Sequence, residues 1–219
     1  MPKSNAKRTL RHPLLQQHWP LLWQALKRPV PWELGQDLLS RYAEPHRSHH
    51  TLQHLEACLN WLQPISTHLQ QPACVQLALW FHDAIYNPQR QDNEQRSADL
   101  AQQTLAEQRL PATLITTVTE LILLTRQHQP PCAGCDAAYL CDIDLAILGA
   151  EPRVYTRYHQ HIQQEYAWLS HDAFRAGRSR LLQTFLQRPN IYTTAFFQTH
   201  LEQQARQNLQ HEYQQLTQQ

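Results

Sequence analysis

Apolar residues recur at helical spacing along most of the chain. In the segments 14–26 and 52–62 they fall three or four positions apart, which places them on one face of a helix. The segment 75–86 is apolar at nearly every position until His82 and Asp83 interrupt it. This pattern predicts a buried helix that carries a polar pair near its end.

Further helices follow from the same spacing and from the positions of proline. Pro31 begins a helix that ends near Tyr42, because the N–H group that proline lacks would have no partner in a first turn. The remaining predicted helices span residues 93–108, 111–126, 137–148, 152–168, 173–186 and 193–215. The chain has 4 glycines against 14 prolines, which favours helices joined by proline-bearing turns. We therefore predict an all-α fold in which residues 13–219 form a single domain after a flexible basic arm, residues 1–12.

Composition and charge narrow the class of protein. Hydrophobic residues make up 42% of the 219 positions, which is typical of a globular chain with a sizeable core. The apolar stretch near the N-terminus is broken by Gln16, Gln17, His18 and Pro20, so neither a signal peptide nor a membrane-spanning helix is predicted. A net charge of +1 gives no broad positive field for nucleic acid. We expect a cytoplasmic protein with no membrane partner and no clear nucleic-acid partner.

Ionisable residues interrupt the apolar helices at places where burial is costly without a partner. His82 and Asp83 end the most apolar helix, and a metal ion would compensate their burial. His50 and His54 lie one turn apart where the helix 52–62 begins. Imidazole and carboxylate ligands together suit Mn²⁺, Fe²⁺, Co²⁺, Ni²⁺ or Zn²⁺, with positions left for water and a phosphate oxygen. The residues therefore predict a metal site.

Two acids in another apolar segment are candidates to complete this site. Asp142 and Asp144 are two positions apart, so on a helix they point roughly 200° away from each other. Only one of them can face a metal ion, and the residues alone leave open which.

The order of these residues resembles the HD superfamily of metal-dependent phosphohydrolases. The histidine, His-Asp pair and later aspartate of that superfamily match His50, His82, Asp83 and Asp144. The chain is more similar still to a bacterial subfamily of HD phosphohydrolases, from about Arg41 to the C-terminus. The segments that carry this likeness are Arg47–His54, Trp80–Tyr86, Asp92–Ser97 and Asp142–Gly149, with Glu165-Tyr166, Gly177-Arg178, Asn190–Tyr192 and Glu202–Leu209 in the C-terminal part.

The resemblance implies an HD-domain-like helical bundle with additional C-terminal helices and a divalent metal ion, which could be Mn, Mg, Fe, Co, Ni or Zn. The implied metal ligands are His50, His82, Asp83 and Asp144. The leucine-containing segment after Asp144 favours it over Asp142, which would then support the site or cap a helix. The chain departs from the subfamily at His49, where a tyrosine is usual, and His49 could compete with His50 as ligand.

The resemblance further implies that metal-activated water hydrolyses a phosphomonoester or phosphodiester, with a nucleotide or another small phosphate ester as substrate. Arg47 and Arg178 are our candidates for binding phosphate, together with His54. Asp83, Glu94 and His128 are the catalytic candidates. Glu94 also fits an acid in the first turn of a helix, and His128 also fits an ordinary loop histidine.

Other interpretations remain open. His128, Cys132, Cys135 and Cys141 have spacings that could close a structural zinc site, although reduced thiols are expected for the five cysteines. A non-catalytic metal- or nucleotide-binding sensor, or a partner-binding module, could use the same fold. A helical nucleic-acid-binding module ranks last at this net charge. We expect a monomer or a homodimer.

Overall fold

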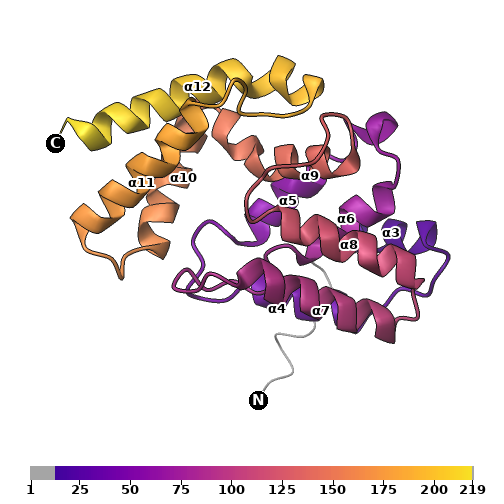
Figure 1. Ribbon diagram of the computed structural model, residues 1–219. Helices are drawn as coiled ribbons and strands as arrows, with labels where there is room; N and C mark the ends of the chain where they lie inside the picture. Colours follow the sequence, from indigo (N-terminus) through magenta and orange to yellow (C-terminus); the bar gives the residue numbers. More distant parts are fainter. Residues whose placement is uncertain (1–12, 219) are drawn as a thin grey trace. The chain divides into compact units, whose positions relative to one another are not determined.

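The structure is a computed structural model that describes residues 13–218 (Figure 1). These residues form α-helices and short 3-10 helices without a strand, so the predicted all-α fold is confirmed. The predicted basic arm, residues 1–12, lies outside the described residues. The chain divides into two compact units, Met1–His128 and Gln129–Gln219. That residues 13–219 make one domain stays a prediction.

In the first unit, several helices pack around one apolar helix, α6 (Pro72–Phe81). The other elements of this unit are α2 (Pro13–Gln17), α3 (Trp19–Ala25), α4 (Trp32–Tyr42), α5 (Leu52–Asn60), the 3-10 helix η1 (Ser66–His68), α7 (Asn93–Glu107) and α8 (Ala112–Leu124). Helix α6 packs against α3, α5, α7 and α8, so residues around its whole circumference are buried. Trp80 of α6 meets Trp19 of α3 edge to face, with ring centroids 4.7 Å apart. This packing explains why the sequence of α6 is apolar at nearly every position.

The second unit is built around its long C-terminal helix. Its elements are α9 (Asp136–Asp144), the 3-10 helix η2 (Leu145–Gly149), α10 (Pro152–Glu165), α11 (His171–Leu186) and α12 (Ala195–Thr217). Helix α12 packs on η2 and α11. The buried Asp142 carboxylate accepts the backbone N–H groups of Thr193 and Thr194, at 2.8 and 2.7 Å, just before α12 begins. Asp142 therefore fixes the two residues that precede α12, while the Thr194 hydroxyl accepts the Phe197 N–H and caps the helix itself.

The predicted helices are found, but several boundaries differ. The predicted segment 14–26 is divided between α2 and α3, with Pro20 in the first turn of α3, where proline is tolerated. The predicted segment 75–86 ends as a helix at Phe81, and 137–148 continues beyond Asp144 as the 3-10 helix η2. A 3-10 turn is a common end for an α-helix.

Gly149 ends η2 against α12 and leaves no room for a side chain. A Cβ atom at this position would lie 2.6 Å from Leu201 Cβ and 2.9 Å from the Leu201 carbonyl oxygen. We expect Gly149→Ala to lower the free energy of unfolding by about 1–3 kcal/mol, because one side of the clash is backbone. Urea unfolding measures this change. Gly177→Ala is the matched control: its Cβ meets nothing within 4 Å in α11, so it should stabilise by about 0.5–1 kcal/mol. Equal urea concentrations at the unfolding midpoint for Gly149→Ala and Gly177→Ala would contradict the expectation.

Candidate metal centre

The candidate metal centre lies in the first unit, between α5 and the end of α6. Helix α5 begins at Leu52, because the Thr51 hydroxyl accepts the Gln53 N–H and caps it. His54 is therefore in the first turn of α5 and is buried, with 6% of its surface exposed. His82 follows the last residue of α6, and Asp83 comes next in the chain.

Three donor atoms converge at this point. The Nε2 atoms of His54 and His82 are 3.2 Å apart. Asp83 Oδ2 lies 3.0 Å from His82 Nε2 and 3.6 Å from His54 Nε2. Ligand atoms about 2.1 Å from a common metal ion are about 3.0 Å apart in octahedral geometry and about 3.4 Å apart in tetrahedral geometry. The observed spacings lie close to these values, so the group could hold a metal ion.

The orientation of His82 suits a ligand. Its Nδ1 lies 2.9 Å from the Leu79 carbonyl oxygen within the last turn of α6. The tautomer that donates from Nδ1 to this carbonyl keeps the lone pair on Nε2, where His54 and Asp83 converge. Such a bond to the second ring nitrogen is the usual way in which proteins orient a metal-binding histidine. Two nitrogens and one carboxylate oxygen would fill three coordination positions of a bound ion, and the remaining positions could take water or a substrate oxygen.

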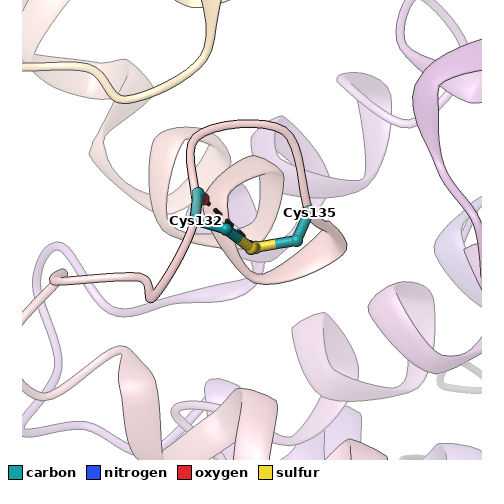
Figure 2. The surroundings of a disulfide bond; sticks show 2 residues. All are labelled: Cys132 and Cys135. Atoms are coloured by element: carbon teal, nitrogen blue, oxygen red, sulfur yellow. Dashed lines mark hydrogen bonds between the residues drawn. A yellow bond between two sulfur atoms is a disulfide. The ribbon is translucent and has the colours of Figure 1, made fainter.

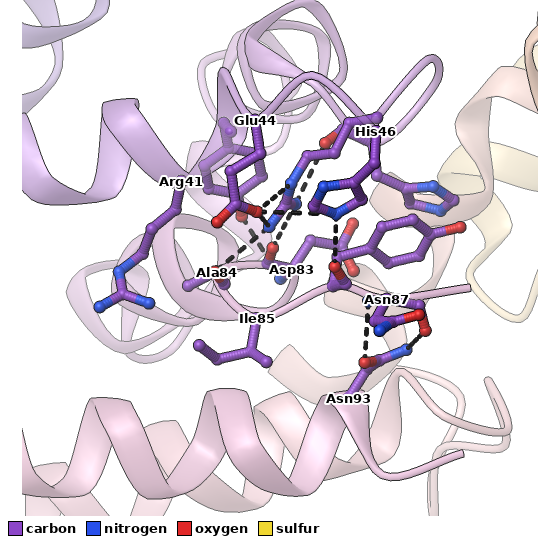
Figure 3. Close-up of polar contacts among 12 residues, drawn as sticks. Arg41, Glu44, His46, Asp83, Ala84, Ile85, Asn87 and Asn93 are labelled. Atoms are coloured by element: carbon purple, nitrogen blue, oxygen red, sulfur yellow. Dashed lines mark hydrogen bonds and ion pairs between the residues drawn. The ribbon is translucent and has the colours of Figure 1, made fainter. Parts of the chain in front are cut away.

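Arg47 holds the chain segment that carries Asp83. Its side chain is fully buried and forms an ion pair with Glu44 at 3.0 Å. Nη1 donates to the carbonyl oxygens of His50 at 3.2 Å and Asp83 at 2.7 Å, and Nη2 donates to that of Ala84 at 3.3 Å. Figure 3 shows Glu44 on one side and the main chain of Asp83 and Ala84 on the other. The Arg47 guanidinium makes hydrogen bonds to both sides. All three guanidinium nitrogens therefore have partners within the protein, and a contact between Arg47 and substrate stays a prediction.

Tyr42 holds the same segment from α4. Its hydroxyl lies 3.4 and 3.3 Å from the carbonyl oxygens of Leu79 and Trp80, and it accepts the Asp83 N–H at 3.3 Å. Burial, followed by the charge of Asp83, raises the pKa of Tyr42 well above its ordinary value. The phenol therefore stays protonated as a donor. These partners replace helical hydrogen bonds, which explains why α6 ends before the polar pair.

Contacts from α7 and from the turn before α5 complete this support. The Ser97 hydroxyl accepts the Ile85 N–H at 3.0 Å, and Asn93 pairs with the main chain of Asn87 (Figure 3). His46 Nε2 lies 2.8 Å from the Tyr86 carbonyl oxygen. Asn93 and Ser97 belong to the segment Asp92–Ser97 that carries the family likeness, but these contacts were not predicted from it. Tyr42 and Glu44 were not predicted as site residues, and their only sequence signal is their position a few residues before Arg47.

Three histidines lie at or just before the start of α5. His54, which we predicted to bind substrate, belongs to the group of donor atoms. The ring of His50 is stacked on Tyr86 at 4.1 Å between centroids and lies 5.9 Å from the His54 ring. The His49 ring is 4.8 Å from that of His54. Direct ligation by His50 stays a prediction, as does competition from His49.

The other predicted catalytic and ligand residues lie on separate elements. Glu94 is in the first turn of α7, as its alternative interpretation predicted. His128 adopts a left-handed conformation (φ 49°) after α8 and donates its N–H to the Leu124 carbonyl. Asp144 is the last residue of α9 in the second unit and is half-buried, whereas both Asp142 oxygens accept backbone N–H groups. Catalysis by Glu94 and His128 and ligation by Asp144 remain predictions.

Arg178, the second predicted phosphate-binding residue, has an internal partner in the second unit. It forms a bidentate ion pair with Glu212, with Nε to Oε1 at 2.7 Å and Nη2 to Oε2 at 3.0 Å. Nη1 donates to the Tyr158 hydroxyl at 3.3 Å. Both partners are nearly inaccessible to solvent, at 6% and 3% exposure. Arg178 thus joins α10, α11 and α12, and its contact with substrate stays a prediction.

The cysteines show no zinc knuckle in the described residues. Cys132 and Cys135 form a disulfide in the loop before α9, where reduced thiols were expected (Figure 2). Cys58, Cys74 and Cys141 are buried thiols outside this disulfide. Burial raises the pKa of the Cys141 thiol to about 12, with Asp144 and Asp142 contributing, so this thiol is protonated at neutral pH in the metal-free chain. Cys132 and Cys135 are three positions apart, and the 5.8 Å between their Cα atoms is within the range that a disulfide spans.

Comparisons with known proteins add no family to this description. Searches against protein-family models, curated proteins and solved structures found no significant match. Among the described residues, no helix has the length and apolarity that crossing a membrane requires.

Proposed function

We propose that the chain is a metal-dependent phosphohydrolase that acts on a small phosphate ester. The observation that carries the proposal is the convergence of His54, His82 and Asp83 donor atoms on one point, with His82 oriented by the Leu79 carbonyl. Histidine and carboxylate ligands with an open side are the donor set of metal centres that activate water. The resemblance to HD phosphohydrolases supports phosphate esters as the substrate class.

The chain's own residues would prepare the site for this chemistry. A bound divalent ion lowers the pKa of water and polarises a phosphate oxygen. His54, His82 and Asp83 would hold the ion, while Arg47 and Tyr42 fix the main chain at Asp83. The deep burial of His54 and His82 keeps bulk water from these two ligands. In this proposal Asp144 and His50 supply further ligands, and Glu94 and His128 assist proton transfer.

Metal content and phosphate release test the proposal together. Wild type and Asp83→Asn are incubated with Mn²⁺, passed over a desalting column and measured for bound metal by mass spectrometry. Asp83→Asn keeps the shape of the side chain but removes its charge, so we expect metal affinity to fall at least about tenfold. Phosphate release is then measured on a panel of nucleotides and other phosphate esters, and the variant should be inactive where the wild type is active.

Asp37→Asn is the matched control, because Asp37 is an exposed acid on α4 whose only described ion pair is with Arg41. It should retain both metal and activity. If Asp83→Asn binds metal as the wild type does, the proposed centre is wrong. If the wild type binds metal and nucleotide but releases no phosphate from any ester, the non-catalytic sensor replaces the hydrolase.

A further inference from the structure

A pocket in the second unit has the chemistry of a separate binding site. It has a volume of about 580 Å³, within the usual range for small-molecule sites. Residues of α10, α11 and the end of α12 line it: His159, Gln163, His171, Phe174, Arg175, Gln215, Leu216 and Gln218. All of these residues belong to one unit, so the pocket is defined within that unit alone.

The lining is rich in hydrogen-bond donors and contains no acid. Arg175 provides a permanent positive charge, and His159 and His171 provide imidazole N–H groups. Three glutamine carboxamides add neutral donors, while Phe174 and Leu216 give apolar surface. Asp172 lies next to the lining, with Oδ1 3.8 Å from His171 Nδ1, but its side chain is 96% exposed and its charge is screened by solvent. The donors and positive charge of the lining residues therefore favour an anionic ligand.

Arg175 is held in a fixed orientation. Its Nε and Nη2 both donate to the carbonyl oxygen of Leu216, in the last turn of α12, with the Nε bond at 3.1 Å. This acceptor is a neutral carbonyl, so the charge of the guanidinium is not cancelled by an acid there. A positioned guanidinium loses less side-chain freedom when it binds an oxyanion.

The buried acid that contacts the lining residue His159 is already balanced. Glu212 lies 2.8 Å from His159 Nδ1, but its two oxygens are paired with Arg178 in bidentate geometry and with the Tyr155 hydroxyl. Burial by itself would raise the pKa of Glu212, but hydrogen bonds from His159 and Arg178 outweigh it and lower the pKa to about 2. The negative charge of Glu212 is therefore largely compensated by Arg178, so it opposes an anion in the pocket only weakly.

We propose that this pocket binds a small molecule through a phosphate or carboxylate group. Arg175 supplies the charge that recognises the oxyanion, His171 and Gln163 supply further hydrogen bonds, and Phe174 contacts the remainder of the ligand. The site does not depend on the metal centre, and it gives the second unit a ligand of its own.

An NMR titration of metal-free protein with inorganic phosphate tests this site. Treatment of the protein with a chelating resin excludes phosphate binding through a metal ion, so failure here is distinguishable from failure of the proposed function. At constant ionic strength, we expect saturable shifts of the backbone amides of residues 159–175 and 215–218. Citrate, as a carboxylate probe, should shift the same amides. Wild-type protein without saturable shifts for either probe would overturn the proposal.

Two adjacent glutamines on α10 provide a matched pair of variants. Gln163→Glu places a negative charge in the lining, whereas Gln164→Glu places the same charge on an exposed neighbour outside it. We expect phosphate affinity to fall at least about fivefold in Gln163→Glu and to be unchanged in Gln164→Glu. On α11, Arg175→Gln should abolish saturable binding and the exposed Arg180→Gln should preserve it. Equal losses within either pair would indicate an adventitious ion only and would also overturn the proposal.

Discussion

Replacement of Arg47 by methionine should lower the free energy of unfolding by about 2–4 kcal/mol, the cost of leaving several largely buried backbone acceptors without their donor. The reason is that its buried guanidinium pairs with Glu44 and satisfies carbonyl oxygens of His50, Asp83 and Ala84. Methionine fills most of the volume but donates no hydrogen bond, so these acceptors lose their partner. Urea unfolding of the metal-free protein measures the change without any contribution from bound metal.

The same substitution should also weaken metal binding by about 10–100-fold, because Asp83 is positioned through its main chain. Arg41→Met is the matched control. Arg41 is six positions earlier on α4, and its ion pair with Asp37 is exposed, so its loss should cost no more than about 0.5 kcal/mol and leave metal affinity unchanged. If Arg47→Met is as stable as Arg41→Met, the buried hydrogen bonds do not support the site as described.

The second unit should lose about 3 kcal/mol of stability as the pH falls from 5 to 2. Glu212 is the cause: its pKa is about 2 in the folded chain against an ordinary value of 4.5. A carboxyl group with a lowered pKa contributes its full stabilisation above its unfolded pKa, and that contribution is lost as pH falls toward the folded pKa. The window is therefore about pH 4.5 to 2, and the sign is loss of stability on acidification.

Urea unfolding followed by circular dichroism at a series of pH values measures this dependence. Glu212→Gln should reduce the slope between pH 4.5 and 2, because glutamine does not titrate, and it should be less stable than the wild type at pH 7. Asp172→Asn is the control in the same unit: its side chain is 96% exposed, so it should leave the slope nearly unchanged. An identical slope in wild type and Glu212→Gln would show that other groups dominate acid unfolding.

Periodicity was sufficient to predict the helices because burial of one face is a local property of the sequence. The ends of helices were less predictable. Helix α6 ends at Phe81 because Tyr42 and Arg47 supply hydrogen bonds to the next residues, and these partners lie about 35 to 40 positions earlier in the chain. The sequence of the segment 75–86 alone therefore cannot predict where the helix ends.

The sequence was sufficient to identify candidate ligand residues, but it predicted their contacts less well. His82 and Asp83 stand out as polar residues ending an apolar helix, and the structure brings their side chains together with His54. The sequence shows that Arg178 is charged, but its partner Glu212 is 34 positions away and has no sequence signal. For Arg47, three of the acceptors are backbone carbonyls, which every residue possesses. An arginine's internal partners are therefore the part of a site that sequence reasoning misses most easily.

The hold that Asp142 has on the two residues before α12 affects how a mutational scan of this chain should be interpreted. Asp142 receives the N–H groups of Thr193 and Thr194, so its replacement would damage the start of the C-terminal helix. Position 142 would then tolerate few substitutions, as a metal ligand does, although its effect would come through folding. Only variants whose metal content and thermal stability are measured together can separate the two causes at neighbouring acids such as Asp142 and Asp144.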